Sequence, residues 1–208
     1  MQTVALIDYG SGNLRSAEKA LAEAGRRTGV EVRVTGDPDA VRQADRVVLP
    51  GVGAFASCRA GLDAATGMVE AMTEAVRQRG APFLGICVGM QLLADRGLEF
   101  GETAGLGWVP GEVRRLAPAT DLPVPHMGWN TVEPVGSDPL LAGAHGMYFA
   151  NSFALHAAEA GDVTGWSDHG GRFAASVRRD NVAGVQFHPE KSQAAGLALL
   201  ERFLEWRP

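Results

Sequence analysis

The sequence is poor in cysteine and in long apolar runs, and both shortages exclude classes of protein. Two cysteines among 208 residues are too few for a disulfide framework, and neither has the Cys-x-x-Cys or Cys/His spacing of a zinc site. No apolar run reaches the roughly 18 residues of a membrane span, and the N-terminal MQTVALIDYG has no signal-peptide pattern. We therefore expect a cytoplasmic protein with reduced thiols and no metal ion.

A basic block is missing as well. The chain has 19 Lys and Arg against 24 Asp and Glu, a formal net charge of -5, and the two signs are interspersed. Binding to nucleic acid or to an anionic membrane needs clustered positive charge, so neither is expected. The ligand should be a small molecule or another protein.

The length and composition are those of one folded unit. With 46% hydrophobic residues, 208 residues can bury one sizeable core. The sequence contains no internal repeat, low-complexity tract or linker-like segment. We therefore predict a single domain that spans residues 1–208.

The first half alternates short apolar strands with helical patterns. Residues 13–27 carry Leu14, Ala17, Ala20, Leu21 and Ala24 at helical spacing, and Gly25 is expected to end that helix. Such βαβ alternation predicts an α/β fold with a doubly wound, mostly parallel sheet and helices on both faces. The expected strands are 3–8, 30–34, 45–50 and 82–86, and the expected helices are 13–27, an acid-capped segment at 37–43 and a stretch within 61–80.

The second half is a series of short strand-like runs between Gly, Asp and Pro turns. These runs predict additional antiparallel strands. An amphipathic stretch at 193–206 should close the chain as a helix. The expected strands are 111–116, 130–135, 147–155, 162–167, 172–180 and 182–187.

Cys87 lies in GICVGMQLL, between an expected strand and an expected helix. The pattern Gly-x-Cys-x-Gly is the thiol form of a nucleophile elbow, in which the glycines let the strained turn pack against the sheet. The first turn of the helix would direct N–H groups and partial positive charge at the sulfur and favour the thiolate. The alternative is a small buried hydrophobe, which is our interpretation of Cys58.

His188 in GVQFHPEKS is the best candidate for the base that a thiol nucleophile needs. Glu190 follows at i+2, and in an extended segment both side chains would project from one face, so that the carboxylate could orient the imidazole. Cys87, His188 and Glu190 would then form a triad. Structural roles are expected for the remaining histidines, which are His126, His145, His156 and His169.

The glycine-rich LPGVGAF follows the strand expected at 45–50. Its loop can turn a backbone N–H of Val52 or Gly53 toward the elbow and form, with the N–H of Val88, an oxyanion hole. One such donor is worth about 2.7 to 4 kcal/mol. Taken alone, the loop could also be an ordinary turn at the end of a strand.

DYGSGNLRS places two glycines after the first strand, as a dinucleotide-binding fingerprint does. The third glycine of that fingerprint is missing, because position 15 is Arg. A nicotinamide oxidoreductase is therefore not favoured.

Six motifs together resemble the class I, triad-type glutamine amidotransferases, and within them the glutaminase subunits of imidazole glycerol phosphate synthase. Chains with FHPE and the second half of GICVGMQLL occur throughout the class, whereas PGVGAF combined with HMGWN is much more specific. The motifs occur in the family's order: DYGSGNLRS, LPGVGAF, GICVGMQLL, GLGWVPGEVRRL, VPHMGWN and GVQFHPEKS.

The resemblance implies a glutaminase site that needs no cofactor. Cys87 would attack the side-chain amide of glutamine, His188 would protonate the departing ammonia, and Glu190 would orient His188. The chain departs from the family pattern at Asn151, where the family usually has a histidine. A second departure is ADRGLEFG, which is less acidic than the family's usual segment, although it keeps Glu99. The substrate contacts implied are Gly51, Gln91, Glu99, Asn151 and Ser152.

The resemblance also implies a partner, a (βα)8-barrel cyclase subunit in a heterodimer. Ammonia would travel to it through a tunnel, because ammonia released into water is protonated and loses its nucleophilic lone pair. The barrel would form imidazole glycerol phosphate and AICAR, a step of histidine biosynthesis. Partner contact is expected at Asn13, which could hold the PGVG loop, and at Met127 and Trp129; Trp129 could equally be a core aromatic.

Two alternatives remain open on the sequence. The chain could serve another ammonia-using synthase, or it could be a catalytically silent scaffold of this fold. We further expect the isolated chain to be a poor glutaminase, with the PGVG loop resting with its donor turned away until a loaded partner shifts it.

Overall fold

The structure, a computed structural model, describes residues 2–11, 13–119, 121–143 and 146–208. Gly12 of the DYGSGNLRS motif and His145, for which a structural role is expected, lie outside these ranges. No helix within the described ranges is long and apolar enough to span a bilayer.

An eight-stranded sheet forms the centre of the molecule, in the order β2-β1-β3-β4-β14-β13-β12-β9. The five strands from β2 to β14 are mutually parallel, and the last three are antiparallel. The mostly parallel α/β sheet is therefore confirmed. The strands are β1 (Thr3–Ile7), β2 (Glu31–Thr35), β3 (Arg46–Leu49), β4 (Phe83–Ile86), β9 (Glu133–Pro134), β12 (Val163–Asp168), β13 (Arg172–Arg179) and β14 (Val182–Val185).

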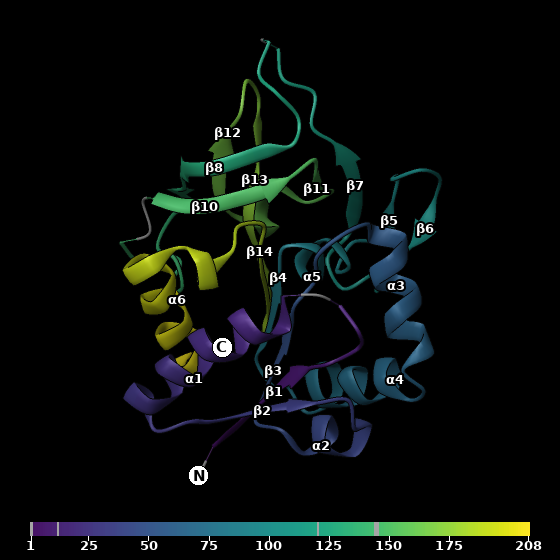
Figure 1. Ribbon diagram of the computed structural model, residues 1–208, viewed down its shortest axis with the longest axis vertical. Helices are drawn as coiled ribbons and strands as arrows, with labels where there is room; N and C mark the ends of the chain where they lie inside the picture. The colour runs from purple at the N-terminus through teal and green to yellow at the C-terminus, as the bar shows by residue number, and fades with distance from the viewer. Residues whose placement is uncertain (1, 12, 120, 144–145) are drawn as a thin grey trace.

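Helices cover both faces of the parallel part, as Figure 1 shows: α1 and α6 lie together on one side, and α2, α3 and α4 lie on the other. Short helical turns follow several strands. The helices are α1 (Leu14–Thr28), α2 (Pro38–Gln43), α3 (Phe55–Ala64), α4 (Met68–Thr73), α5 (Val88–Gln91) and α6 (Gln193–Glu205), with single turns η1 (Glu74–Gln78), η2 (Ala160–Asp162) and η3 (Pro189–Lys191).

The first helix runs past the residue expected to end it. Gly29 caps α1 in the left-handed region at φ 74°, whereas Gly25 lies inside the helix. A Cβ on Gly25 would lie 2.4 Å from the carbonyl oxygen of Val30, so this glycine serves close packing and not helix termination.

The expected strand at 147–155 is two strands in two different sheets. It breaks at Ser152: β10 (Gly146–Asn151) pairs with β8 (His126–Thr131), and β11 (Phe153–Ala157) pairs with β7 (Gly111–Arg115). The sheet of β11 and β7 continues to β5 (Arg96–Gly97) and β6 (Thr103–Ala104). The antiparallel strands predicted for the second half are present, and one further strand of that half, β14, pairs with β4 in parallel. The break at Ser152 places residues 150–153 at the junction of the sheets.

Aromatic packing joins the small β8–β10 sheet to the central sheet. The ring of Phe149 on β10 contacts Phe173 on β13 and Phe187 after β14 edge-on, with centroids 5.6 and 5.7 Å apart. Phe149 and Phe187 are fully buried. Edge-to-face pairs add to the area buried, so this cluster fixes β10 against the chain that follows β14.

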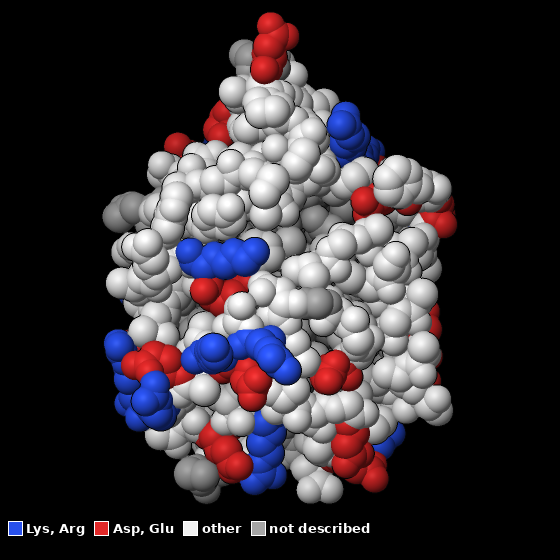
Figure 2. Space-filling view, viewed as in Figure 1, with Lys and Arg blue, Asp and Glu red and all other residues white. Residues whose placement is uncertain are grey.

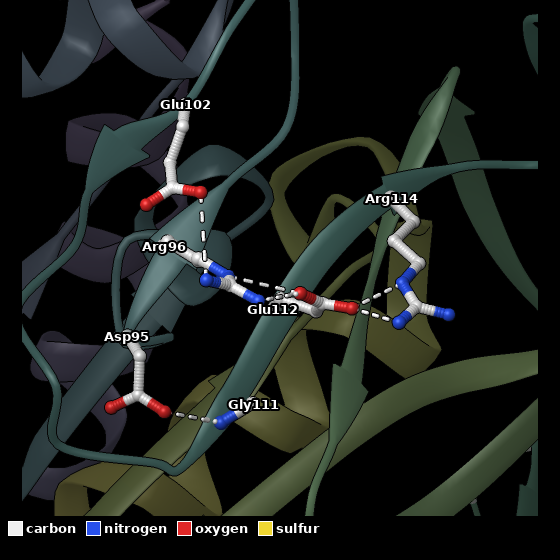
Figure 3. Close-up of polar contacts among 6 residues, drawn as sticks. All are labelled: Asp95, Arg96, Glu102, Gly111, Glu112 and Arg114. Atoms are coloured by element: carbon white, nitrogen blue, oxygen red, sulfur yellow. Dashed lines mark hydrogen bonds and ion pairs between the residues drawn. The ribbon is translucent and has the colours of Figure 1, made fainter.

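An exposed ion-pair network holds the segment between β5 and β6. Figure 3 shows Arg96 on β5 between Glu102 and Glu112, with Arg114 on the far side of Glu112. Arg96 reaches one oxygen of Glu112 through two nitrogens at 3.0 and 2.9 Å. Exposed pairs are weak one by one, but a connected set ties β5, β7 and the 97–103 segment together. Glu99 lies in that segment.

Gly89 in α5 lies against the end of β3. A Cβ at this position would lie 1.9 Å from the carbonyl oxygen of Leu49, a backbone atom. Position 89 can therefore hold only glycine without moving α5 away from the sheet.

We predict that Gly89→Ala destabilises the protein by about 3 kcal/mol, because the backbone of β3 cannot yield to the added methyl. Urea unfolding measures the change. Gly161→Ala is the matched control, since a Cβ there meets no atom within 4 Å. Equal stability of the two variants would contradict the close approach at Gly89.

Candidate active site

Cys87 lies at the junction of β4 and α5, as expected for an elbow. Its backbone has φ 53° and ψ -111°, a region that non-glycine residues rarely adopt. Its N–H donates to the carbonyl of Val185 at 2.8 Å, and the residue is 4% exposed. The strained turn thus holds a nearly buried thiol at the carboxyl end of the parallel strands.

His188 and Glu190 form a buried pair beside this thiol. His188 Nδ1 and Glu190 Oε1 are 2.7 Å apart, and because a carboxylate only accepts, Nδ1 carries the hydrogen. The extended i, i+2 geometry expected from the sequence is wrong, however. Glu190 lies in the single 3-10 turn η3, and this turn brings the carboxylate back to the imidazole.

Asn13 bonds to Glu190 and not to the PGVG loop. Its side-chain amide donates to Glu190 Oε1 at 2.7 Å, from a left-handed residue at the start of α1. The expectation that Asn13 holds the loop is therefore corrected. Asn13 instead fixes the carboxylate that faces His188, since both donate to the same oxygen.

The environment of His188 favours its charged form. Burial acts to lower the pKa of His188, but hydrogen bonds and charge interactions with Cys87 and Glu190 outweigh it and raise the pKa to about 9. At neutral pH, His188 therefore carries a proton that it can give to a leaving group.

Three side chains form hydrogen bonds with the backbone of the PGVG loop. The Val52 N–H donates to Ser11 Oγ at 3.1 Å, and Cys58 Sγ donates to the Val52 carbonyl at 3.3 Å. The hydroxyl of Tyr9 donates to the Pro50 carbonyl at 2.7 Å. Both backbone polar groups of Val52 are thus engaged: Ser11, in the segment after β1, accepts from its N–H, and Cys58 of α3 donates to its carbonyl.

The second expected oxyanion donor is engaged as well. The N–H of Val88 donates to the carbonyl of Gly51 at 3.3 Å. Gly53, at φ 94°, is exposed at the loop's edge. In this structure neither the Val52 nor the Val88 N–H is available to an incoming oxyanion.

A cavity of about 300 Å³ opens above Cys87. It brings together most of the expected site residues from five separate stretches of the chain. Two of the expected catalytic and substrate-contact residues do not line the cavity: Glu190 lies behind His188, and Gly51 of the loop is buried against Val88 and Gly89. The lining residues expected from the sequence are Val52, Gly53, Cys87, Val88, Gln91, Glu99, Asn151, Ser152 and His188; those not expected are Pro125, Ala150, Phe153 and Lys191.

Three polar residues of the cavity already have protein partners. The Gln91 amide nitrogen donates to the Phe153 carbonyl at 2.9 Å, and Asn151 Nδ2 donates to the same oxygen at 3.1 Å. Glu99 accepts the N–H of Phe55 at 2.7 Å. The buried Asn151 Oδ1 finds no partner within the described part of the chain, so an acceptor remains at the cavity wall.

Met127 and Trp129 lie away from the cavity on β8. They are 66% and 51% exposed, and Trp129 contacts Tyr148 of β10 edge-on. The alternative of a core position for Trp129 is therefore wrong.

Sequence reasoning missed Ser11, Gln186 and Lys191. Lys191 follows Glu190 in η3, and its amine lies 5.9 Å from the centroid of the Tyr148 ring. Ser11 and Gln186 are parts of quoted motifs, but only the fold shows that they contact Val52 and Cys87.

We predict that Glu190→Gln destabilises the protein most below about pH 6.5 and least above pH 9. The folded-state pKa of His188 is raised, so its stabilising contribution is complete below the unfolded value and disappears as the pH rises through about 9. The substitution should cost about 1.4 kcal/mol for each unit by which it lowers that pKa. Urea unfolding at pH 6 and 9.5 measures the difference.

The control for this pH dependence is the same substitution in a His188→Gln background. There the cost of Glu190→Gln should no longer change between pH 6 and 9.5. A pH-dependent cost that persists without the imidazole would show that another group is responsible.

Known proteins resemble this chain along nearly its whole length. Residues 5–206 match the family model described as glutamine amidotransferase class-I. Imidazole glycerol phosphate synthase subunit HisH of Caulobacter vibrioides is 66% identical over 215 aligned positions, covering 100% of both chains. The HisH subunit of Rhodopseudomonas palustris is 54% identical and covers 99% of this chain and 100% of its own.

Solved structures share the fold at low sequence identity. A structure described as a glutamine amidotransferase aligns with a TM-score of 0.72 at 20% identity, over 97% of each chain. A glutamine amidotransferase of Thermotoga maritima aligns with a TM-score of 0.64 at 17% identity, over 91% of this chain and 76% of that one. With the full-length matches above, the chain belongs to the class-I glutamine amidotransferase family and, within it, to the HisH subunits of imidazole glycerol phosphate synthase.

Proposed function

We propose that this chain is a glutaminase subunit that hydrolyses L-glutamine to glutamate and ammonia and passes the ammonia to a cyclase partner. The observation that carries the proposal is the strained Cys87 elbow beside the buried His188–Glu190 pair, at the floor of a cavity of about 300 Å³. The reaction needs no cofactor, and the two cysteines fit a reducing cytoplasm.

In the first step, the thiolate of Cys87 attacks the side-chain amide carbon of glutamine. The C–N bond then breaks, and the protonated His188 gives its proton to the departing ammonia. The raised pKa of His188 suits this role, because the imidazolium is present at neutral pH.

In the second step, water hydrolyses the thioester. Neutral His188 now takes a proton from the water, the hydroxide attacks the acyl carbon, and the C–S bond breaks to release glutamate and the Cys87 thiolate. Glu190 keeps the same ring orientation through both steps, and Asn13 keeps Glu190 in place.

Glutamine binding is assigned to the polar groups of the cavity wall. Asn151 Oδ1, buried and without a protein partner among the described residues, can accept from an amide or ammonium group of the substrate. Gln91, Glu99 and Ser152 line the same cavity. A site built from such groups rejects analogues that leave them unpaired.

Partner docking is assigned to the β8–β10 face. Figure 2 shows few charged side chains over these strands, whereas Lys, Arg, Asp and Glu crowd the lower half of the same view. Exposed Met127 and Trp129 on β8 supply the apolar and aromatic contacts that interfaces favour. The partner proposed is the (βα)8-barrel cyclase of imidazole glycerol phosphate synthase, which forms imidazole glycerol phosphate and AICAR in histidine biosynthesis.

Low activity of the isolated chain is part of the proposal. The N–H groups of Val52 and Val88 both donate within the protein, so the oxyanion hole is incomplete at rest. A loaded partner would stabilise an alternative loop in which one N–H faces the substrate. One donor is worth about 2.7 to 4 kcal/mol, which corresponds to a stimulation of about 10² to 10³-fold.

Two other functions predict different results in the same assay. A glutaminase subunit for another synthase would hydrolyse glutamine through Cys87 without responding to this cyclase. A catalytically silent scaffold would hydrolyse no glutamine, either alone or with the cyclase.

The test is glutamate release from glutamine by the chain alone and with an imidazole glycerol phosphate synthase cyclase subunit plus its nucleotide ligand. We expect stimulation of about 10² to 10³-fold, and loss of activity to background in Cys87→Ala. Activity in Cys87→Ala equal to that of the wild type would refute the mechanism.

A second prediction concerns the loop contacts. Ser11→Ala should raise the unstimulated glutaminase rate about fivefold, because the resting loop loses a hydrogen bond worth about 1 kcal/mol. The stimulated rate should stay the same. Cys58→Ala should act in the same direction, since it releases the Val52 carbonyl.

Ser57→Ala is the matched control for these variants. Ser57 is an exposed serine of α3, one residue before Cys58, and it lies outside the cavity. A lower unstimulated rate in Ser11→Ala would mean that Ser11 supports the active loop and does not hold the resting one.

A further inference from the structure

Gln186 contacts the sulfur of Cys87 directly. Its side-chain nitrogen lies 3.6 Å from Cys87 Sγ, a hydrogen-bond distance for the large sulfur atom, and Gln186 is fully buried. Fully buried glutamine is uncommon unless its amide is satisfied. The mechanism based on Cys87, His188 and Glu190 gives Gln186 no role, so this contact needs its own explanation.

The orientation of the Gln186 amide is determined by its neighbours. The Gln91 nitrogen donates to the Phe153 carbonyl at 2.9 Å, and a carbonyl can only accept. The same nitrogen donates to Gln186 Oε1 at 3.0 Å. With its oxygen facing Gln91, Gln186 must present its NH₂ group to Cys87.

The backbone holds Gln186 at this place. Its N–H donates to the Ala175 carbonyl of β13 at 2.9 Å, and the residue directly follows β14. Gln186 and His188 are two residues apart at the end of this strand; Gln186 contacts the Cys87 sulfur, and interaction with Cys87 helps to raise the pKa of His188. The end of β14 thus supplies an amide donor to the sulfur and carries the imidazole of His188 close by.

We propose that Gln186 is a positioning residue that donates to the Cys87 thiolate, stabilising it and holding the sulfur toward the cavity. A hydrogen bond to the charged form of a group favours that form. Burial of Gln186 strengthens the contact, because water does not compete for its amide. The proposal rests on the proposed function of Cys87 as nucleophile.

Of the titratable groups near the sulfur, Tyr9 and Cys58 cannot take over this role. His188 and, behind it, Glu190 face it from the end of β14, Tyr9 from the end of β1, and Cys58 from α3. Burial raises the pKa of both Tyr9 and Cys58, so they are neutral at neutral pH. Gln186 adds a donor that does not titrate, so its contribution is constant across the pH range.

The test measures alkylation of Cys87 by iodoacetamide as a function of pH, followed by mass spectrometry of the peptide that contains Cys87. Gln186→Met keeps the approximate volume and removes the donor. We expect the midpoint of its pH profile to rise by about one unit, a tenfold lower rate on the acidic side of the midpoint. The assay uses the full chain and needs no glutamine.

Gln186→Glu provides a second variant in case the methionine disturbs folding. It keeps the acceptor for Gln91 but places a carboxylate oxygen against the sulfur, so its midpoint should rise further than that of Gln186→Met. Ser176→Ala is the matched control. It removes a different buried hydrogen bond, the one between Ser176 Oγ on β13 and Thr164 Oγ1 on β12 at 3.0 Å. Its profile should match the wild type.

The outcomes separate this inference from the proposed function. A pH profile that is the same in Gln186→Met as in the wild type would overturn the role of Gln186 alone. A wild-type Cys87 that does not react with iodoacetamide at any pH would overturn both the role of Gln186 and the nucleophile. An upward shift in both Gln186 variants, absent from Ser176→Ala, would support the inference.

Discussion

The parallel pairing of β4 with β14 is the contact on which the candidate site depends. Val185 is the last residue of β14, and its carbonyl accepts the N–H of Cys87 at 2.8 Å. This bond aligns the elbow after β4 with the chain that leaves β14. Because parallel strands end at the same edge, Cys87, Gln186 and His188 come together there although about a hundred residues separate the first from the others.

Around that edge the side chains form successive layers of hydrogen bonds. His188 is held by Glu190, which is held by Asn13 at the start of α1. On the other side, Gln186 is held by Gln91, which donates to the strand after Ser152. A buried polar group without a partner is costly, so each layer stabilises the orientation of the next.

The PGVG loop, which carries the proposed oxyanion donor, differs from this rigid arrangement because its hydrogen bonds are few and can be exchanged. Ser11 and Cys58 each contribute one hydrogen bond to the Val52 peptide, and Gly51 and Gly53 flank it. Contacts worth about 1 kcal/mol each can be replaced when a partner binds. The same edge of the sheet therefore combines a rigidly held cysteine, the proposed nucleophile, with a loop suited to control.

The sequence by itself determined the α/β class, the elbow at Cys87 and the pairing of His188 with Glu190, because these follow from short patterns within a few residues. It could not determine which element ends where: Gly25 packs against Val30 inside α1, and residues 147–155 split between two sheets at Ser152. Contacts between distant segments decided the rest. Asn13 reaches Glu190, Ser11 takes the Val52 N–H, and Gln186 reaches Cys87 only because the sheet order brings these residues to one edge. Local periodicity carries no information about which strands become neighbours, and only the tertiary structure supplies it.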